Sequence, residues 1–323
     1  MLTNLVKEFY SSDFLLNGLP DELRLKASRP APVPPITARP NRLSVTEIET
    51  LITNPYAIYA KKVLNLKKFK NTSHTPDFRN KGLLLHSTLE EFISENIDIL
   101  PDQKKSCDLL RDKFKLILTR SAIPIEVKNV WIAQFNNRVE SIVALERERR
   151  LSGKPVALEI PAKYLVKLKG NNEFLITAKA DRIDLGNSGV TIYDYKTGQI
   201  TKKKLEKFSP QLDIEALMLI SGSFGKAFEG GDLGLSLVGL GSDLKQVKKL
   251  VTTIDLKLWQ EALIDLIERM KLELSPFVAR LIPPSQNTFS DDYEHLSRFG
   301  EWNDNDDLRE VMIKFASKGS TRL

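Results

Sequence analysis

The stretch FLITAKADRIDLGNSGVTIYDYKTG occupies residues 174–198 and carries the strongest strand signal in the chain. Two runs rich in β-branched and aromatic residues flank the turn GNSG, which predicts an antiparallel pair of strands. The run ALEIPAKYLVKL at 157–168 ends in the turn KGNNE and predicts a third strand before them. A helix over about 205–220, a strand over 233–240 and an amphipathic helix over 257–274 are expected to follow. This order predicts an α/β fold in which helices flank a mixed sheet.

Helical periodicity dominates the chain before these strands. Ser44-Val-Thr-Glu47 is a capping-box pattern and predicts a short helix, which Pro55 should end. The segment KGLLLHSTLEEFISENI at 81–97 predicts a helix that carries His86 and Glu90 on one face. Apolar residues keep a helical spacing farther on, and we interpret residues from about 100 to 150 as a helical insertion.

Proline and the apolar pattern suggest where the domains lie. Residues 30–40, PAPVPPITARP, contain five prolines and predict an extended linker. We therefore expect a helical remnant and this linker at 1–40, one globular domain at 41–302 and a tail at 303–323.

Composition narrows the class of protein. The formal net charge is +6 at a pI of about 9.1, which favours a polyanionic partner such as DNA. Cys107 is the only cysteine, so no disulfide framework and no cysteine-held metal cluster can form within the chain. We find no secretory leader and no run of 18 apolar residues, and expect a soluble cytoplasmic protein without a membrane partner.

Acidic and basic residues meet on the last two predicted strands. Side chains alternate across a strand, so Asp194 and Lys196 project from one face and Tyr193 from the other. Asp181 precedes Asp194 by 13 residues, which is consistent with adjacency across the turn, whereas Asp184 should point to the opposite face. An aspartate and a lysine two residues apart more often form an ion pair on a solvated sheet. Apposed carboxylates, however, favour a cation between them, and Mg²⁺ prefers such oxygen ligands.

Ordered motifs give the chain a family resemblance. GLLLHSTLE at 82–90, ADRID at 180–184, YDYKTG at 193–198 and PQL at 210–212 are similar to motifs of PD-(D/E)XK nucleases of the RecB type. More closely, the proline-rich segment, RLSVTEIETLITNPYAIYAKKVL at 42–64 and HLSRFGEW at 295–302 resemble the carboxy-terminal nuclease domain of the AddB subunit of AddAB helicase–nucleases, in its α-proteobacterial form. The resemblance implies a restriction-endonuclease-like fold over residues 41–302.

The resemblance also implies roles for individual residues. Asp181 and Asp194 would bind Mg²⁺ or Mn²⁺ and act in catalysis with Lys196, while His86 and the Tyr195 backbone carbonyl would be further metal ligands. A histidine packed in the core and a helix-capping glutamine are the structural alternatives for His86 and Gln211. The residues expected to contact DNA or support the site are Gln211, Glu90, Lys202, Lys203 and Lys204.

Two features of the family's larger members are missing from this sequence. Asn54 stands where some relatives have a cysteine, and a single cysteine cannot hold an iron–sulfur cluster, so none is expected. No G-x-x-x-x-G-K-[ST] motif occurs, so no ATP site is expected. An AddA-like helicase–nuclease subunit would then act as a separate partner.

These patterns lead to one functional hypothesis and one alternative. The hypothesis is a magnesium-dependent deoxyribonuclease that acts in DNA end processing or double-strand-break repair. The alternative is a catalytically silent DNA-binding or assembly module derived from a truncated helicase–nuclease subunit.

Overall fold

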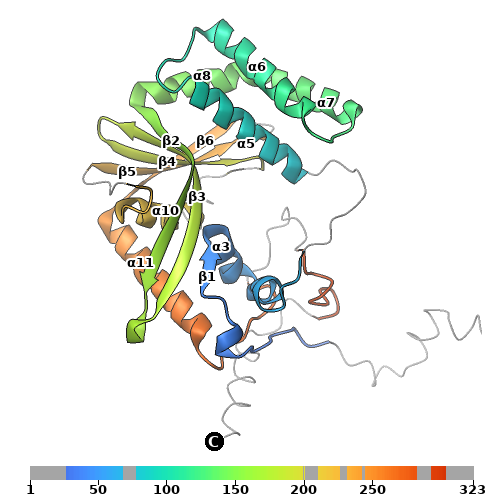
Figure 1. The fold of residues 1–323 in the computed structure, drawn as a ribbon, viewed down its shortest axis with the longest axis vertical. Helices are drawn as coiled ribbons and strands as arrows, with labels where there is room; N and C mark the ends of the chain where they lie inside the picture. Colours follow the sequence, from blue (N-terminus) through green and yellow to red (C-terminus); the bar gives the residue numbers. More distant parts are fainter. Residues whose placement is uncertain are drawn as a thin grey trace, which may run out of the picture. The chain divides into compact units, whose positions relative to one another are not determined.

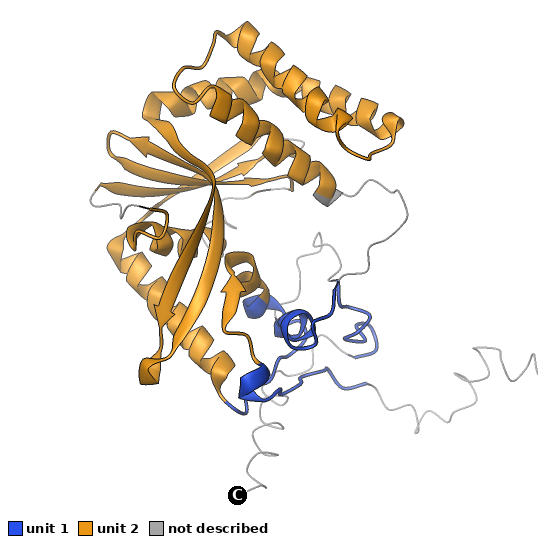
Figure 2. Cartoon of the chain, in the orientation of Figure 1, with its two compact units in different colours: residues 1–38, 51–68, 273–323 blue, residues 39–50, 69–272 orange. Residues whose placement is uncertain are grey.

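The computed structural model describes residues 27–67, 78–198, 200, 210–225, 231–241, 244–281 and 292–302. The chain divides into two compact units (Figure 2). Unit 1 comprises residues 1–38, 51–68 and 273–323, and unit 2 comprises residues 39–50 and 69–272. Every described strand belongs to unit 2.

Unit 2 is built on a six-stranded mixed sheet (Figure 1). Strand β3 pairs antiparallel with β2 and β4 and parallel with β1, while β5 pairs parallel with β4 and antiparallel with β6. The predicted mixed sheet is confirmed, although the sequence patterns had indicated neither β1 nor β6. The strand bounds are β1 (Arg42–Ser44), β2 (Gly153–Lys167), β3 (Glu173–Gly186), β4 (Gly189–Lys196), β5 (Asp232–Gly239) and β6 (Lys245–Val251).

The turn between β3 and β4 needs glycine for a steric reason. At Gly189, where β4 begins beside β5, an ideal Cβ would lie 1.9 Å from the carbonyl oxygen of Asp232. Only a residue without a side chain allows the two backbones to approach this closely. Gly189 therefore serves the parallel β4–β5 contact, whereas Gly186, where a Cβ would lie 2.4 Å from the carbonyl oxygen of Ser152, serves the approach of β3 to the start of β2.

Four helices lie on one side of the sheet (Figure 1). Their apolar faces form a common core in which the rings of Phe114 and Phe135 stack with centroids 4.1 Å apart. Tyr193 and Tyr195 of β4 belong to the same core, as expected for the face opposite Asp194. The helices are α5 (Phe78–Glu95), α6 (Gln103–Thr119), α7 (Ile125–Asn136) and α8 (Val139–Ser152).

Helices α10 (Pro210–Ile220) and α11 (Thr253–Lys271) lie on the other side of the sheet (Figure 1). Nearly every residue of α10 is buried, and α10 contacts β4, β5 and α11. Helix α11 begins with a reciprocal capping box between Thr252 and Asp255. Both helices were predicted, and the expected first turn of α10 lies outside the described residues.

The predicted capping box and proline break near residue 50 are confirmed. The Ser44 amide donates to Glu47 Oε2 at 2.9 Å, and the Glu47 amide donates to Ser44 Oγ at 3.2 Å. Helix α3 (Val45–Thr53) follows, and Pro55 begins the next helix, α4 (Pro55–Ile58). Proline is accepted there because the first helical amide has no partner within the helix.

In unit 1 the proline-rich segment makes backbone hydrogen bonds with a later part of the chain. The amides of Phe277 and Ala279 donate to the carbonyls of Pro32 and Pro30 at 2.9 and 3.0 Å. The segment contains the short 3-10 helix η2 (Ile36–Ala38). Farther along the chain, α4 leads into the π-helix η3 (Tyr59–Val63). The proline-rich stretch is thus tied to residues 277–279 at its backbone.

Within the described part of the chain, none of the helices combines the length and apolarity that crossing a bilayer requires.

Candidate active site

The site lies where β3 and β4 separate. Their antiparallel pairing runs from Leu185↔Val190 to Arg182↔Tyr193, so Asp181 and Asp194 are the next opposed positions beyond its end. Asp181 Oδ2 accepts a hydrogen bond of 2.8 Å from the amide of Tyr195. The Asp181 carboxylate therefore bridges the two strands where they separate. It accepts a hydrogen bond from a backbone amide that has no backbone partner on β3.

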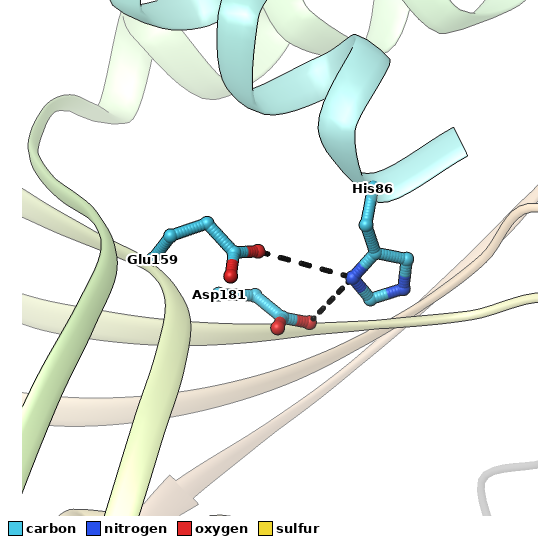
Figure 3. Close-up of side chains that lie close together, drawn as sticks. All are labelled: His86, Glu159 and Asp181. Carbon is cyan, nitrogen blue, oxygen red and sulfur yellow. Dashed lines mark ion pairs between the residues drawn. The ribbon is translucent and has the colours of Figure 1, made fainter. Parts of the chain in front are cut away.

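His86 approaches this fork from helix α5. Its Nε2 lies 2.9 Å from the carbonyl oxygen of Tyr195. Its Nδ1 lies 3.6 Å from Asp181 Oδ2 and 4.0 Å from Glu159 Oε1 (Figure 3). With Nε2–H donating to the carbonyl, the lone pair of Nδ1 faces the two carboxylates. Burial opposes the charged imidazole, but the neighbouring carboxylates, chiefly Asp181, outweigh it and raise the pKa of His86.

Glu159 is a site residue that the sequence patterns did not indicate. It stands across from Asp181 in the β2–β3 register, between the pairs Leu158↔Arg182 and Ile160↔Ala180. Its φ of +48° is a left-handed conformation that is uncommon for residues other than glycine. The carboxylate of Glu159 faces His86, and one ligand atom from each of His86, Glu159 and Asp181 lies within 4.8 Å of the others (Figure 3).

Two further charged residues surround Glu159. Lys179, two residues before Asp181 on β3, forms an ion pair with Glu159 Oε2. Glu90 lies one turn beyond His86 on α5, and burial, then the charge of Glu159, raises the pKa of Glu90. The predicted placement of His86 and Glu90 on one helix face thus brings both toward the same carboxylate.

A hydrogen-bonded chain links the other half of the site to α10. Lys196 Nζ donates to Asp194 Oδ1 at 2.9 Å and to Gln211 Oε1 at 3.1 Å. The amide nitrogen of Gln211 lies 3.1 Å from Asp194 Oδ1 and 3.2 Å from Glu215 Oε1, and it donates to both. Gln211 therefore holds the positions of Asp194 and Lys196 relative to each other.

Burial controls the electrostatics of these groups. Asp194 is 3% exposed, and burial, with the nearby charge of Asp181, raises its pKa to about 6 despite the attraction of Lys196. For Lys196, the charge of Asp194 outweighs burial and raises the pKa of the ammonium group. Glu215 is 1% exposed, its Oε2 has no hydrogen-bond partner among the described residues, and burial raises its pKa well above the usual value.

Asp184 takes no part in this cluster. Its carboxylate receives two hydrogen bonds from the guanidinium of Arg182, at 2.5 and 2.8 Å, and Arg182 also pairs with Glu146 of α8. Strand alternation puts Arg182 and Asp184 on the face opposite Asp181. The expectation that only one of the two aspartates of ADRID lines the site agrees with these contacts.

The structure thus places most of the sequence-predicted site residues close together. His86, Asp181 and the backbone of Tyr195 meet at one point, and Asp194, Lys196 and Gln211 form the adjoining chain. Lys202, Lys203 and Lys204 lie outside the described residues. For Glu159, the signal available in the sequence was an acidic residue at the matching distance from the turn in the preceding strand.

Comparisons with known proteins relate the chain to several sequences. Two uncharacterized proteins are similar, one from Rickettsia conorii at 38% identity over 196 residues (58% of this chain, 23% of the relative) and one from Rickettsia typhi at 37% over 215 residues (63% and 24%). One of the subunits of an ATP-dependent helicase/deoxyribonuclease from Clostridium acetobutylicum is 28% identical over 206 residues, which is 56% of this chain and 17% of that protein. The chain spans about a quarter of the length of the Rickettsia relatives it matches.

A solved structure of a candidate exonuclease from Eubacterium rectale covers 86% of this chain and 97% of its own, at 14% identity and a TM-score of 0.39. The family model described as the PD-(D/E)XK nuclease superfamily matches residues 42–280. The motif-based resemblance to that family and to AddB is thereby confirmed. This match covers well over half of the residues of the chain. The chain therefore belongs to the PD-(D/E)XK nuclease superfamily and has the restriction-endonuclease-like α/β fold of that family.

Proposed function

We propose that this chain is a divalent-metal-dependent deoxyribonuclease that hydrolyses phosphodiester bonds during DNA end processing or double-strand-break repair in the cytoplasm. The observation that carries the proposal is the meeting of His86, Asp181, Asp194 and Lys196 at the fork between β3 and β4. Membership of a nuclease superfamily supports the reaction class.

The donor atoms at the fork suit a hard divalent cation. Carboxylate oxygens of Asp181 and Glu159 and a ring nitrogen of His86 face one another within coordination range, and Asp194 adds a buried carboxylate beside them. Mg²⁺ prefers oxygen ligands and retains several waters, while Mn²⁺ also accepts imidazole. We propose that His86, through Nδ1, Asp181 and Asp194 hold the ion with help from Glu159. The Tyr195 carbonyl lies at Nε2, on the opposite edge of the imidazole, so it orients His86 in place of its predicted role as a ligand.

Each chain group has a distinct part in the proposed reaction. A bound divalent ion would lower the pKa of a water molecule and polarise a phosphoryl oxygen. Lys196, fixed by Asp194 and Gln211, presents an ammonium group that can orient the attacking water and stabilise negative charge on the phosphoryl group. His86 is held in one orientation by the Tyr195 carbonyl, so its Nδ1 needs no reorganisation to face a cation.

We propose DNA as the substrate and a helicase–nuclease subunit resembling AddA as a partner. The similarity to one of the subunits of a helicase/deoxyribonuclease supports both, although this chain matches only 17% of that protein.

Cleavage of labelled linear and circular DNA, single- and double-stranded, tests the proposal directly. The full chain should cleave DNA with Mg²⁺ or Mn²⁺ and lose activity in EDTA. Asp194→Asn and Lys196→Met should abolish cleavage, while Lys257→Met, on the exposed side of α11, should retain it. Circular dichroism verifies that each variant is folded. Binding of DNA without cleavage by the wild-type chain under any metal condition would instead favour the silent-module alternative.

A further inference from the structure

Tyr195 of β4 contacts two of the proposed metal ligands. Its amide donates to Asp181 Oδ2 at 2.8 Å, and its carbonyl oxygen lies 2.9 Å from His86 Nε2. Its ring, which belongs to the core beneath the helices, packs edge-on against the imidazole of His86, with centroids 5.9 Å apart and an angle of 80° between the planes. The position of Tyr195 therefore sets the positions of His86 and Asp181.

The hydroxyl of Tyr195 is held by an arginine of α8. Arg149 Nη1 donates to this hydroxyl at 3.2 Å, and Arg149 Nε donates to Gln246 Oε1 on β6 at 3.3 Å. The guanidinium also lies 5.7 Å from the centroid of the Tyr195 ring and 5.0 Å from that of Tyr193. Arg149 is 5% exposed. Because a guanidinium is planar and its donors have fixed directions, these contacts hold the Tyr195 side chain in one place.

The charge of Arg149 is not required to neutralise a buried carboxylate. Glu146, one turn earlier on α8, pairs with Arg150 at 2.7 Å and with Arg182, whereas Arg149 Nη1 lies 4.0 Å from it. Replacing buried charged groups by apolar residues of similar volume is often neutral or stabilising when no partner is left unpaired. The direct effect of the bond from Arg149 to Tyr195 is therefore expected at the site, through the peptide groups of Tyr195.

The number of contacts between α8 and the ligands sets the size of the expected effect. One hydrogen bond joins Arg149 to Tyr195, and one further contact joins Tyr195 to His86 or to Asp181. Residues that directly orient a metal ligand change metal affinity or activity by about 10- to 100-fold when they are replaced. A residue one contact farther away should have a smaller effect, of about three- to tenfold.

We propose that Arg149 is a positioning residue of the nuclease site, which holds the Tyr195 hydroxyl and thereby fixes the two peptide groups that orient His86 and Asp181 toward a divalent cation. This inference rests on the proposed function, and it gives α8, at the end of the helical insertion, a part in metal binding. Arg149 acts only through Tyr195, so its loss should change the geometry of the ligands and leave their chemistry intact.

The orientation of His86 can be measured without metal or substrate. The chain has three histidines, so labelling with ¹⁵N-histidine and comparison with His86→Gln assigns the ring signals of His86. In EDTA at alkaline pH, the neutral wild-type ring should carry its proton on Nε2, which donates to the Tyr195 carbonyl. Tyr195→Phe and Arg149→Met should each raise the population of the Nδ1–H tautomer by about three- to tenfold.

Isothermal titration calorimetry with Mn²⁺ tests the consequence for metal binding. Tyr195→Phe and Arg149→Met should each raise the Kd for Mn²⁺ by about three- to tenfold, and the double variant should show no further increase, because both changes remove one hydrogen bond. Saturating Mn²⁺ should restore most of the rate at which the variants hydrolyse bis(p-nitrophenyl) phosphate. Circular dichroism identifies a temperature at which every variant is folded, where a loss of stability alone does not change the Kd.

Tyr193→Phe is the matched control. It removes the neighbouring hydroxyl on the same face of β4, which forms no hydrogen bond with Arg149, and it should leave the Kd and the tautomer populations at their wild-type values. If Arg149→Met does not fold, Tyr195→Phe decides the question, because it removes a single oxygen atom.

Wild-type Mn²⁺ affinity and unchanged His86 tautomers in Tyr195→Phe would overturn the positioning role, as would equal changes in Tyr193→Phe. Cleavage by these variants at the wild-type rate in limiting Mn²⁺ would also reject the positioning role while keeping the nuclease. A wild-type chain that binds no Mn²⁺ and cleaves no diester would instead reject the proposed function. The tautomer measurement, made in EDTA, separates these two failures.

Discussion

Replacing Arg182 by methionine should be among the most destabilising single changes in unit 2. Arg182 is fully buried and donates two hydrogen bonds to Asp184, which is itself 2% exposed. Glu146 keeps Arg150 at 2.7 Å when Arg182 is lost, but no other ion pair to Asp184 is found among the described residues. The variant therefore leaves one buried carboxylate without its partner.

The magnitude follows from what that carboxylate can do. An unpaired buried charge costs about 3–5 kcal/mol. Asp184 can avoid this by binding a proton, which at pH 7 costs about 1.4 kcal/mol for each of the roughly three pH units above its unfolded pKa, or about 4 kcal/mol. Such a loss lowers the Tm by roughly 8–16 °C for a unit of this size.

Thermal and urea unfolding followed by circular dichroism measure this loss. The free energy of unfolding of Arg182→Met should lie below that of the wild type, and this difference should shrink from about pH 7 toward about pH 5, because Asp184 binds a proton more easily in acid. Adding Asp184→Leu should restore part of the stability. Arg111→Met removes a partly exposed pair with Asp108 and should cost less than about 1 kcal/mol. Equal losses in the two arginine variants, or a deficit that grows in acid, would refute the reasoning.

Three further outcomes can be measured. Burial raises the pKa of Glu215, so the protonated side chain contributes stability that is complete below about pH 4.5. This contribution is lost as the pH rises through the pKa of Glu215 in the folded state. In EDTA, the Tm of the wild-type chain should therefore fall relative to that of Glu215→Gln between about pH 5 and 8. Mn²⁺ at about 100 times its dissociation constant should stabilise the wild-type chain by about 2.7 kcal/mol in urea unfolding, and Asp181→Ala should remove this gain. Gly189→Ala should cost about 1–3 kcal/mol in the same assay, because its Cβ would overlap the neighbouring strand, whereas Gly198→Ala meets no atom within 4 Å and should be nearly neutral.

The strands missed from the sequence show how far local patterns reach. Strand β1 has three residues, too few for an alternating pattern to stand out. Strand β6, KQVKKLV, contains three lysines and lies at the edge of the sheet, where charged residues discourage pairing with other chains. Both strands are defined by the partners they pair with, and a pattern within the segment does not record those partners.

The candidate site also combines residues that local sequence patterns placed correctly with residues that they did not place. Alternation and the distance from the turn were enough to place Asp181 opposite Asp194 and Asp184 on the other face, because both depend on the fixed period of a strand. Glu159 matches Asp181 in its distance from the turn between β2 and β3, and Gln211 and Glu215 are one helical turn apart, so spacing along the chain could have indicated both relations. The link from Lys196 to Gln211 joins β4 to α10 and does not follow from spacing.

The sequence by itself determined four of the six described strands, the hairpin at residues 186–189 and the pairing of the two aspartates, since short-range periodicity and turn chemistry specify them. The contact of Glu159 with His86 and the link from Lys196 to Gln211 arose only in the tertiary structure. They join residues of α5, β2, β4 and α10, and their positions depend on how the sheet twists and where its strands separate.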